Sequence, residues 1–218
     1  MLVIALDTST PAVTVGLVAL DGGRPRVVAE RVTINPRAHG ELLMPQLLDV
    51  LTEAGHQLAD ADAIVVGAGP GPFTGLRVGM ATAAALGQAC GHPVHPVCSL
   101  DAIAAQATAE GPLLVATDAR RKEVYWAAYD AERTRIDGPH VQRPAEVPTE
   151  EFTAAAGEMA EALDLDVVEP RYPTPVGLVA AAAAALRAEP APLVPLYLRR
   201  PDAEAPGKRK SVLTRGGK

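Results

Sequence analysis

The stretch IVVGAGPGPFTGLRVGMATAAALGQACG, residues 64–91, decides how the rest of the chain is interpreted. It begins with three β-branched residues, passes through a loop rich in glycine and proline, and continues as a helical pattern that Gly91 and Pro93 end. Glycine permits backbone angles that other residues avoid, whereas proline fixes φ, so the composition of this loop makes it rigid. The stretch therefore predicts a strand, a tight corner and a helix over 74–90.

Glycine-rich corners that open onto a helix often bind phosphate, through backbone N–H groups and the helix dipole. The known patterns do not fit this corner. Gly75 is followed by Leu76 and Arg77 instead of the Lys-Ser/Thr of a P-loop. A dinucleotide fingerprint that began at Gly67 would need glycine where Pro72 stands. A structural corner is the favoured interpretation.

Asp7 ends the first expected strand, residues 2–7, and turn-forming residues follow it. An acid at a strand end can hold a metal-bound phosphate, and it can equally cap a turn. If the chain binds a nucleotide, Asp7, Gly69 and Gly71 are the candidate residues. The favoured alternative gives all three a structural role.

The expected helix 74–90 carries a stripe of small residues. Gly75, Gly79, Ala83 and Gly87 recur every four residues and so lie on one face. Because glycine inside a helix costs roughly 1 kcal/mol relative to alanine, something must pack unusually close to this face. The close neighbour is either another element of the same domain, which the sequence favours, or a second polypeptide.

Composition excludes several classes of protein. The 218 residues, 48% apolar and 21% charged, are those of an ordinary globular protein of one or two domains. The aromatic content of 3% and the formal charge of −6 argue against a stacking platform or a broadly basic surface for nucleic acid. Cys90 and Cys98 lack metal-ligand spacing, and the N-terminus shows no basic leader. We expect a cytoplasmic protein without a membrane segment.

The order of expected elements predicts a duplicated α/β architecture. Strands are expected at 2–7, 12–20, 26–34, 64–66, 94–97, 115–118 and 123–129, and helices at 41–54, 74–90, 100–109, about 150–163 and 176–188. This is the layout of the actin-like, sugar-kinase and heat-shock ATPase superfamily, with two related α/β domains of which the second is abbreviated. The expected division is an N-terminal domain over 1–108, a smaller C-terminal domain over 109–198, and a basic, disordered tail over 199–218.

Five segments together resemble the TsaB family. They are IALDTS at 4–9, RAHGELLMPQL at 37–47, GAGPGPFTGLRVGMATAAAL at 67–86, DARRKEVYWAAY at 118–129 and PLYLRR at 195–200. The resemblance spans nearly the whole chain and is weakest over 135–170. It implies a bacterial subunit of the machinery that makes threonylcarbamoyladenosine, the modified adenosine beside the anticodon of tRNA.

The resemblance also implies partners. A TsaB-like chain would be a non-catalytic paralogue that supports a TsaD-like catalytic subunit together with a TsaE-like ATPase, meets tRNA only through that complex, and forms a homodimer when the partner is absent. ATP and a metal are expected in the partner subunits, and no cofactor in this chain alone. The catalytic relative binds its metal with two histidines four residues apart. Ser99 and Ile103 stand at those positions here and cannot replace two imidazoles.

In the family, the counterparts of the helices 41–54 and 74–90 form the interface. The first of these helices is apolar over most of its circumference, which leaves one side needing a partner. The partner-binding residues expected from the resemblance are His39, Leu43, Leu47, Gly75, Arg77, Gly79 and Ala83.

Three other hypotheses remain open. An ATP-dependent phosphotransferase would use Asp7 with the glycine corner. A peptidase-like protein would need a nucleophile with a base, which Ser9, Ser99 and the five scattered histidines do not indicate. A general scaffold unrelated to tRNA is the third. Basic tail residues are either solvated, which is favoured, or contact tRNA phosphates; they are Lys208, Arg209, Lys210 and Arg215.

Overall fold

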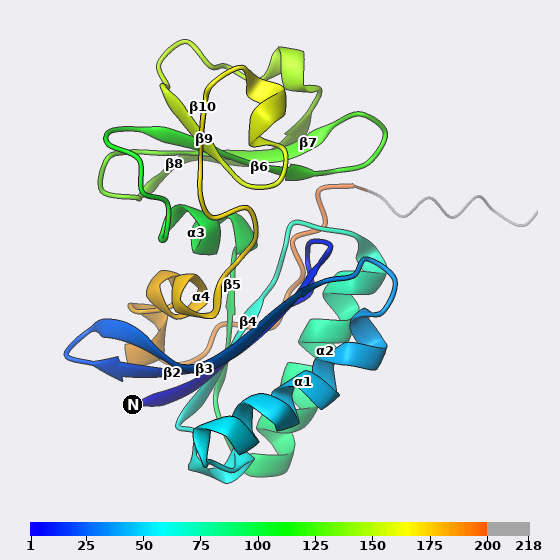
Figure 1. Cartoon of the computed structure of the whole chain (residues 1–218), viewed down its shortest axis with the longest axis vertical. Helices are drawn as coiled ribbons and strands as arrows, with labels where there is room; N and C mark the ends of the chain where they lie inside the picture. The colour runs from blue at the N-terminus through cyan, green and yellow to red at the C-terminus, as the bar shows by residue number, and fades with distance from the viewer. Residues whose placement is uncertain (200–218) are drawn as a thin grey trace, which may run out of the picture.

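Two five-stranded sheets organise the chain (Figure 1), whose computed structural model describes residues 1–199. The first sheet consists of β1 (Leu2–Asp7), β2 (Ala12–Asp21), β3 (Arg24–Ile34), β4 (Ala63–Gly67) and β5 (Val94–Val97). The second consists of β6 (Leu113–Asp118), β7 (Val124–Tyr129), β8 (Arg135–Gln142), β9 (Ala154–Ala156) and β10 (Asp166–Val168).

The two sheets have the same topology. The first has the strand order β3-β2-β1-β4-β5, and the second, read from its antiparallel end, has the order β8-β7-β6-β9-β10. In each sheet the first three strands form an antiparallel meander, and the last two run parallel to the central strand. The prediction of a duplicated α/β fold of the actin-like class is confirmed.

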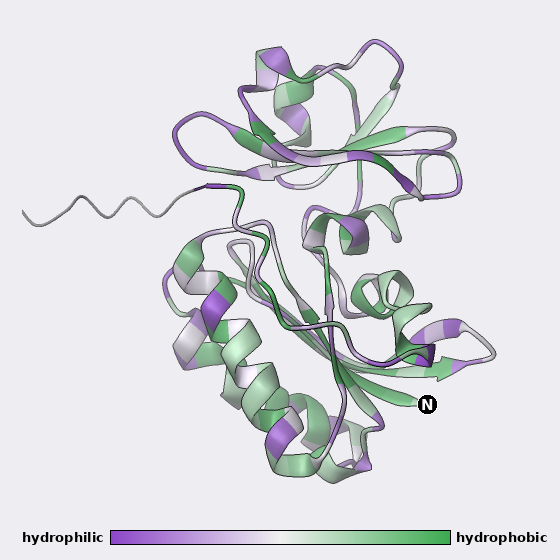
Figure 2. Ribbon diagram, turned by 180° about the vertical axis from the view of Figure 1, so that it is seen from behind, coloured by the Kyte–Doolittle hydropathy of each residue, from purple (hydrophilic) through white to green (hydrophobic). Residues whose placement is uncertain are grey.

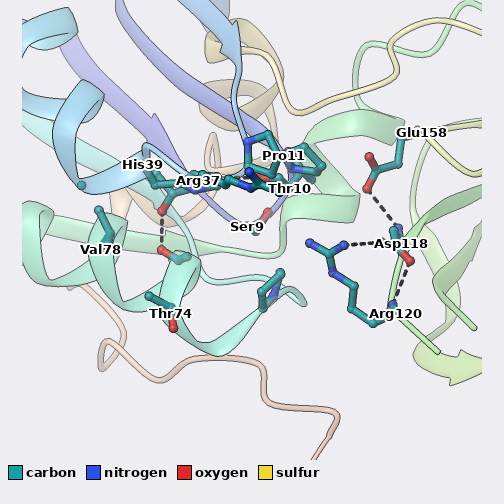
Figure 3. Close-up of a pocket in the computed structure, with 15 residues that line it drawn as sticks. Ser9, Thr10, Pro11, Arg37, His39, Thr74, Val78, Asp118, Arg120 and Glu158 are labelled. Atoms are coloured by element: carbon teal, nitrogen blue, oxygen red, sulfur yellow. Dashed lines mark hydrogen bonds and ion pairs between the residues drawn. The ribbon is translucent and has the colours of Figure 1, made fainter.

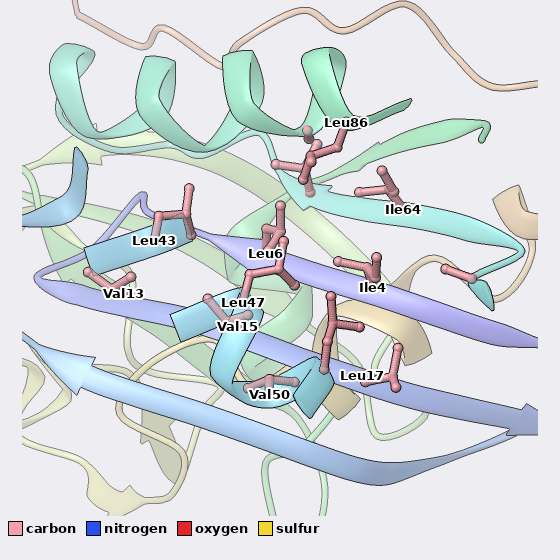
Figure 4. Packing of buried hydrophobic residues seen from close by; sticks show 14 of the residues in the cluster. Ile4, Leu6, Val13, Val15, Leu17, Leu43, Leu47, Val50, Ile64 and Leu86 are labelled. Atoms are coloured by element: carbon pink, nitrogen blue, oxygen red, sulfur yellow. The ribbon is translucent and has the colours of Figure 1, made fainter. Parts of the chain in front are cut away.

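Helices cover both faces of the first sheet. On one face lie α1 (His39–Ala54) and α2 (Phe73–Cys90), and on the other lie α3 (Ser99–Ala104) and α4 (Pro175–Ala181). Along β1, Ile4 and Leu6 pack under α1 and α2 (Figure 4), whereas Val3 and Ala5 pack under α4. This alternation follows from the two-residue period of a strand that is buried on both faces.

The second lobe is abbreviated because short 3₁₀ turns replace its crossover helices. Where the first lobe has α1 and α2, the second has η2 (Pro144–Glu146) and η3 (Ala160–Leu163). The predicted helix over 150–163 is therefore wrong, since Ala154–Ala156 forms β9 beside β6. Alanine favours a helix locally, but here the backbone hydrogen bonds of the sheet and burial between two layers outweigh that preference.

The other predicted elements differ mainly at their ends. The strand at 94–97 and the helices at 41–54 and 74–90 are present. The two helices begin one or two residues earlier than expected. The helix expected over 100–109 ends at Ala104, and the helix expected over 176–188 divides into α4 and the turn η4 (Ala185–Arg187). A further turn, η1 (Leu58–Asp60), precedes β4.

The C-terminal part of the described chain returns to the first lobe. Leu178 and Val179 of α4 pack against Val3 and Val65 of the first sheet. Beyond η4 the chain runs as an extended segment from α4 past α2 toward the second lobe (Figure 2). Leu196 donates its backbone N–H to the oxygen of Ala68 at 2.8 Å. Within the second domain expected over 109–198, α4 therefore packs on the first sheet, whereas Leu196 and Leu198 also pack against the second-lobe core.

Within residues 1–199, no helix combines the length and the apolar character that crossing a bilayer requires. The tail predicted to be basic and disordered lies outside the described residues except for Arg199. The hypothesis that Lys208, Arg209, Lys210 and Arg215 contact tRNA stays a prediction.

Candidate functional site

A cleft of about 170 Å³ lies between the two lobes (Figure 3). The first lobe lines it with the β1–β2 turn, the chain leading into α1, and the start of α2. The second lobe lines it with the β6–β7 turn and Glu158. The polar and charged lining residues are Thr8, Ser9, Thr10, Arg37, His39, Thr74, Asp118, Arg120 and Glu158.

Asp7 does not face this cleft. Its side chain is fully buried, and its carboxylate accepts hydrogen bonds from the backbone N–H and the hydroxyl of Ser9, both at 2.7 Å, and from the hydroxyl of Ser99 at 2.5 Å. Burial raises the pKa of Asp7, and the hydrogen bonds from Ser99 and Ser9 oppose that rise. These contacts tie the end of β1 to the start of α3, so Asp7 has a structural role.

The glycine corner is also closed by its own chain. A side chain at Gly67 would overlap the carboxylate of Asp7, and one at Gly71 would overlap the backbone oxygen of Ser9. Gly69 has φ of 93° and donates its N–H to the Ser99 hydroxyl at 3.2 Å. All three glycines are buried. The structural role that the sequence favoured for Asp7, Gly69 and Gly71 fits this geometry, because the Asp7 carboxylate and the Gly69 N–H are bonded within the chain and Gly71 is buried against Ser9.

The small-residue stripe of α2 is filled from within the subunit. A Cβ at Gly75 would lie 2.5 Å from the backbone oxygen of Thr8, and one at Gly79 would lie 2.5 Å from its hydroxyl. The Thr8 hydroxyl donates to the oxygen of Gly75 at 2.7 Å and accepts from the N–H of Gly79 at 3.0 Å. Of the two neighbours expected for the stripe, the structure shows the one in the same domain.

Most of the expected partner-binding residues are inside the subunit. Leu43, Leu47 and Ala83 are 1%, 0% and 0% exposed and belong to the core between the helices and the first sheet (Figure 4). Gly75 and Gly79 are buried against Thr8. These five residues cannot contact a partner directly, and their placement there is corrected. The helical pattern of apolar residues alone could not distinguish the face of a helix that meets the core from a face that meets a partner.

The two remaining members of that set lie at the surface near the cleft. His39 is half-buried, and its Nε2 lies 2.8 Å from the backbone oxygen of Thr10. Arg77 is exposed, and its guanidinium stands 3.9 Å above the ring of Phe73. Phe73 in turn stacks on Tyr197, with ring centroids 5.2 Å apart. Sequence reasoning named Arg77 but missed the stack, because Tyr197 lies 120 residues away from Arg77 in the chain.

The outward faces of α1 and α2 carry a different set of residues. On α1 they include Pro45, Leu48 and Asp49, and the Leu48 side chain is 52% exposed. On α2 the exposed residues are mostly small and uncharged: Ala81, Ala84, Ala85, Gln88 and Ala89. In the hydropathy colouring, the middle turns of α2 are predominantly green (Figure 2). These two outward faces are the region of the described surface that best fits a helix-to-helix contact.

The β6–β7 turn forms the second-lobe wall of the cleft. Arg120, Arg121 and Lys122 all have positive φ, at 62°, 55° and 61°. Left-handed backbone costs a non-glycine residue roughly 1–2 kcal/mol. Hydrogen bonds within the turn hold this conformation, including those between Ala119 N–H and the oxygen of Glu123 and between Glu123 N–H and the oxygen of Arg120, both at 3.0 Å.

Asp118 and Glu158 fix the base of this turn. Asp118 accepts the N–H of Arg120 at 2.8 Å and pairs with its guanidinium at 3.5 Å (Figure 3). The Glu158 carboxylate accepts the N–H of Asp118 at 3.1 Å, and burial raises its pKa. Asp7 and Asp118 thus occupy equivalent places in the two lobes, since each ends the central strand and accepts the N–H two residues further on.

The candidate nucleophiles are not activated. Burial raises the pKa of the Cys98 thiol to about 12, so it is not a thiolate at neutral pH. Ser9 and Ser99 both donate to Asp7 instead of to a histidine. Ser99 and Ile103 were compared with the two metal-binding histidines of the catalytic relative, and Ile103 is fully buried in the second-lobe core. Among residues 1–199, no three His, Cys, Asp or Glu side chains are grouped to hold a metal.

The repeated strand order and the cleft between the lobes define a two-lobed α/β protein of the actin-like fold. The structure of YeaZ from Pseudomonas aeruginosa superposes with a TM-score of 0.73 at 30% identity, covering 90% of this chain and 99% of that one. The profile of the family described as "TsaD: tRNA N6-adenosine threonylcarbamoyltransferase" matches residues 26–151. The chain belongs to the TsaB family, which includes the YeaZ proteins and is related to the TsaD transferases.

Two relatives show how far the similarity extends. The tRNA threonylcarbamoyladenosine biosynthesis protein TsaB of Escherichia coli is 36% identical over 139 residues, which are 62% of this chain and 58% of that protein. An uncharacterized protein of Mycobacterium bovis is 54% identical over 204 residues, 93% of each chain. The chain thus spans little more than half of the named TsaB relative.

Proposed function

We propose that this chain is a non-catalytic subunit of the complex that makes threonylcarbamoyladenosine in tRNA, and that it binds a TsaD-like catalytic subunit through the outward faces of α1 and α2. The observation that carries the proposal is the pair of faces described above. Small, uncharged side chains along α2 let a second helix approach closely, and the exposed Leu48 of α1 offers apolar area to bury.

The non-catalytic role is supported by the positions that carry histidines in the catalytic relative. Ser99 uses its hydroxyl to hold Asp7, and Ile103 is a core residue, so neither is available to a metal. In this proposal the metal and ATP reside in the partner subunits, which are the TsaD-like subunit and a TsaE-like ATPase. The tRNA is bound within the assembled complex, and two copies of this chain pair through the same faces when the partner is absent.

The test measures association with the TsaD-family transferase encoded in the same genome, using light scattering to weigh the mixture. We expect the wild-type chain to form a complex, and Leu48→Asp and Ala85→Arg to abolish or strongly weaken it. Each change places a charge in the middle of the proposed contact, where it would be desolvated without a partner. Both positions are exposed in the free chain, so the fold should be unaffected.

Ile136→Asp is the matched control. Ile136 lies on β8 of the second lobe and is 58% exposed, close to the 52% of Leu48. It should leave association unchanged. Normal association of both helix variants would show that the contact lies elsewhere, and a wild-type chain that never associates would refute the partner role itself.

The peptidase and phosphotransferase alternatives receive no support from the described residues. The hydroxyls of Ser9 and Ser99 are directed at a carboxylate, and the Cys98 thiol is neutral. Asp7 and the glycine corner are sealed by packing within the chain. We therefore carry neither alternative forward.

A further inference from the structure

Two aromatic side chains meet at the surface where the start of α2 faces the end of the described chain. The rings of Phe73 and Tyr197 are stacked at 5.2 Å with an interplanar angle of 29°, and the residues are 38% and 40% exposed. The whole chain has one tryptophan, four tyrosines and two phenylalanines. Two of these few aromatic residues are therefore stacked on each other where solvent reaches them.

Arg77 extends this stack with a third planar group. Its guanidinium carbon lies 3.9 Å from the Phe73 ring centroid, and its Nε lies 3.4 Å from the Tyr197 hydroxyl. Arginine held over an aromatic ring keeps its charge while presenting a flat face. The three side chains together form a partly exposed group of planar surfaces.

The cationic β6–β7 turn lies beside this group. Arg120 lines the same cleft as Pro72 and Thr74, which flank Phe73 in the chain. Arg199, two residues after Tyr197, pairs with Glu123 at the foot of the turn. Arg120, Arg121 and Lys122 are all exposed. The nearby acids are Asp118 and Glu123, which pair with Arg120 and Arg199, and Glu158, which accepts the N–H of Asp118. The cations Arg77, Arg120, Arg121, Lys122 and Arg199 outnumber these three acids.

The left-handed backbone of the turn gives this charge a fixed position. Consecutive residues with φ near 60° are unusual for side chains other than glycine, and here all three are cationic. Strained conformations are retained where the surrounding structure holds them, and they concentrate at binding sites. A solvated loop would have no need of three such residues in succession.

We propose that this aromatic-cationic surface, formed by Phe73, Arg77, Arg120, Arg121, Lys122 and Tyr197, binds single-stranded RNA. Unpaired bases stack on aromatic rings and on guanidinium planes, while phosphates release counterions on meeting lysine and arginine. The inference rests on the proposed function in one respect, namely that the RNA strand is the unpaired loop of the tRNA bound by the complex. The surface is distinct from the uncharged middle of α2 that we assign to the protein partner.

The overall composition conceals this surface. A formal charge of −6 and 3% aromatic residues argue against an RNA-binding protein when they are averaged over the chain. The fold brings a helix start, a hairpin turn and the C-terminal segment to one place, and so concentrates the few suitable residues. Electrostatic binding depends on the local charge at the contact, because the Debye length at physiological salt is only about 8 Å.

The test uses the full chain, alone and in complex with the transferase, and a short fluorescein-labelled RNA hairpin with a single-stranded loop. Affinity is measured by fluorescence anisotropy over a salt series. Arg121→Gln with Lys122→Gln should weaken binding and reduce the slope of log affinity against log salt by about 1.4, since each phosphate contact on a single strand contributes about 0.7. Tyr197→Ala should weaken binding about tenfold with the slope unchanged, and Tyr197→Phe should bind as the wild type does.

The matched control is Arg24→Gln with Arg26→Gln. Both are exposed cations at the β2–β3 hairpin of the first lobe, outside the cleft lining. This control should leave affinity and slope unchanged. Unaltered RNA binding in the turn and Tyr197→Ala variants would overturn the proposal, as would equal affinity for a loop-free duplex of the same length.

Light scattering separates the two proposals. If the turn variants associate normally with the transferase but bind RNA as tightly as the wild type, only the RNA surface is refuted. If they lose association with the transferase while RNA affinity is unchanged, the surface is a protein contact and the RNA proposal is wrong. If the wild-type chain binds the hairpin but never associates with the transferase, the partner role fails and the RNA surface stands.

Discussion

The Thr8 hydroxyl bonds to both the backbone oxygen of Gly75 and the backbone N–H of Gly79 in α2. These are the two groups that an i to i+4 bond pairs in an α-helix. Thr8 leads out of β1, so this contact fixes the turn at the cleft to the helix that carries the proposed partner-binding face. The absence of side chains at Gly75 and Gly79 lets Thr8 come this close to the helix.

Thr8→Val should lower the free energy of unfolding by about 1–3 kcal/mol, because it removes a buried hydroxyl that both donates and accepts. Urea denaturation followed by circular dichroism measures the change. Thr52→Val is the matched control. Thr52 donates its hydroxyl to the oxygen of Leu48 on the exposed side of α1, where water can replace the bond, so little change is expected. Equal losses in both variants would contradict a special role for Thr8.

Gly79→Ala should destabilise the protein even though alanine favours helices by roughly 1 kcal/mol over glycine. The new Cβ would lie 2.5 Å from the Thr8 hydroxyl, and overpacking of this kind typically costs about 1–3 kcal/mol. Gly40→Ala in α1 should instead stabilise slightly, since its nearest neighbour would be Val78 Cγ2 at 4.0 Å. Thermal unfolding midpoints of the two variants should therefore move in opposite directions.

Asp7 should make the protein less stable as the pH rises, which is the opposite of the usual effect of a carboxyl group. Its pKa in the folded protein is raised above 3.8 by burial, so the folded state retains its proton longer than the unfolded chain does. The free energy of unfolding should therefore fall as the pH rises from about 3.8 through the raised value. Asp7→Asn should remove that decline when unfolding is measured across this range.

Asp60 supplies the opposite control for the pH experiment. The backbone N–H of Gln57 lowers the pKa of this exposed carboxyl. The contribution of ionised Asp60 to the free energy of unfolding is present above pH 3.8 and is lost as the pH falls through the lowered pKa. Asp60→Asn should thus remove a loss of stability at acid pH and leave the Asp7 decline in place. The Asp7 interpretation is wrong if the decline persists in Asp7→Asn.

Cys90 should react with iodoacetamide in the native protein much faster than Cys98. Cys90 is half-buried, whereas Cys98 is 8% exposed and its pKa is raised to about 12. Because the thiolate is the reactive form, we expect a ratio of at least about tenfold near neutral pH. Peptide mass spectrometry of partly labelled protein gives the ratio. In Cys90→Ser, labelling should require denaturant, and rapid native labelling of Cys98 would show that its site opens.

Local sequence was sufficient to predict the elements whose hydrophobic pattern agrees with the glycine and proline residues that bound them. The corner after β4 was predictable because glycine and proline restrict it without reference to the rest of the chain. The helices around Leu43 and Ala83 were predictable from their period. Both features are set within a few residues, which is why the duplicated layout could be derived from the chain alone.

The predictions that were wrong concern residues whose structure depends on neighbours far away in the chain. Ala154–Ala156 forms a strand because it pairs in parallel with β6. Leu43 and Leu47 proved to be core residues because the first sheet, and not a partner, covers them. The stack of Phe73 on Tyr197 joins the start of α2 to the last residues that the structure describes. Spacing along a sequence cannot report which of two apolar faces meets the interior.

The return of α4 to the first sheet affects the order in which a ribosome could release folded parts. The second lobe's strands come from one contiguous run between β6 and β10, so that sheet can assemble as soon as the run has emerged. The first sheet must wait for α4 to cover its second face, and for Leu196, near the end of the described chain, to pack against the core on the α1 and α2 side. Although its strands are synthesised first, the amino-terminal lobe is therefore the last to be completed, and until then the apolar surface that α4 covers stays exposed, which favours aggregation.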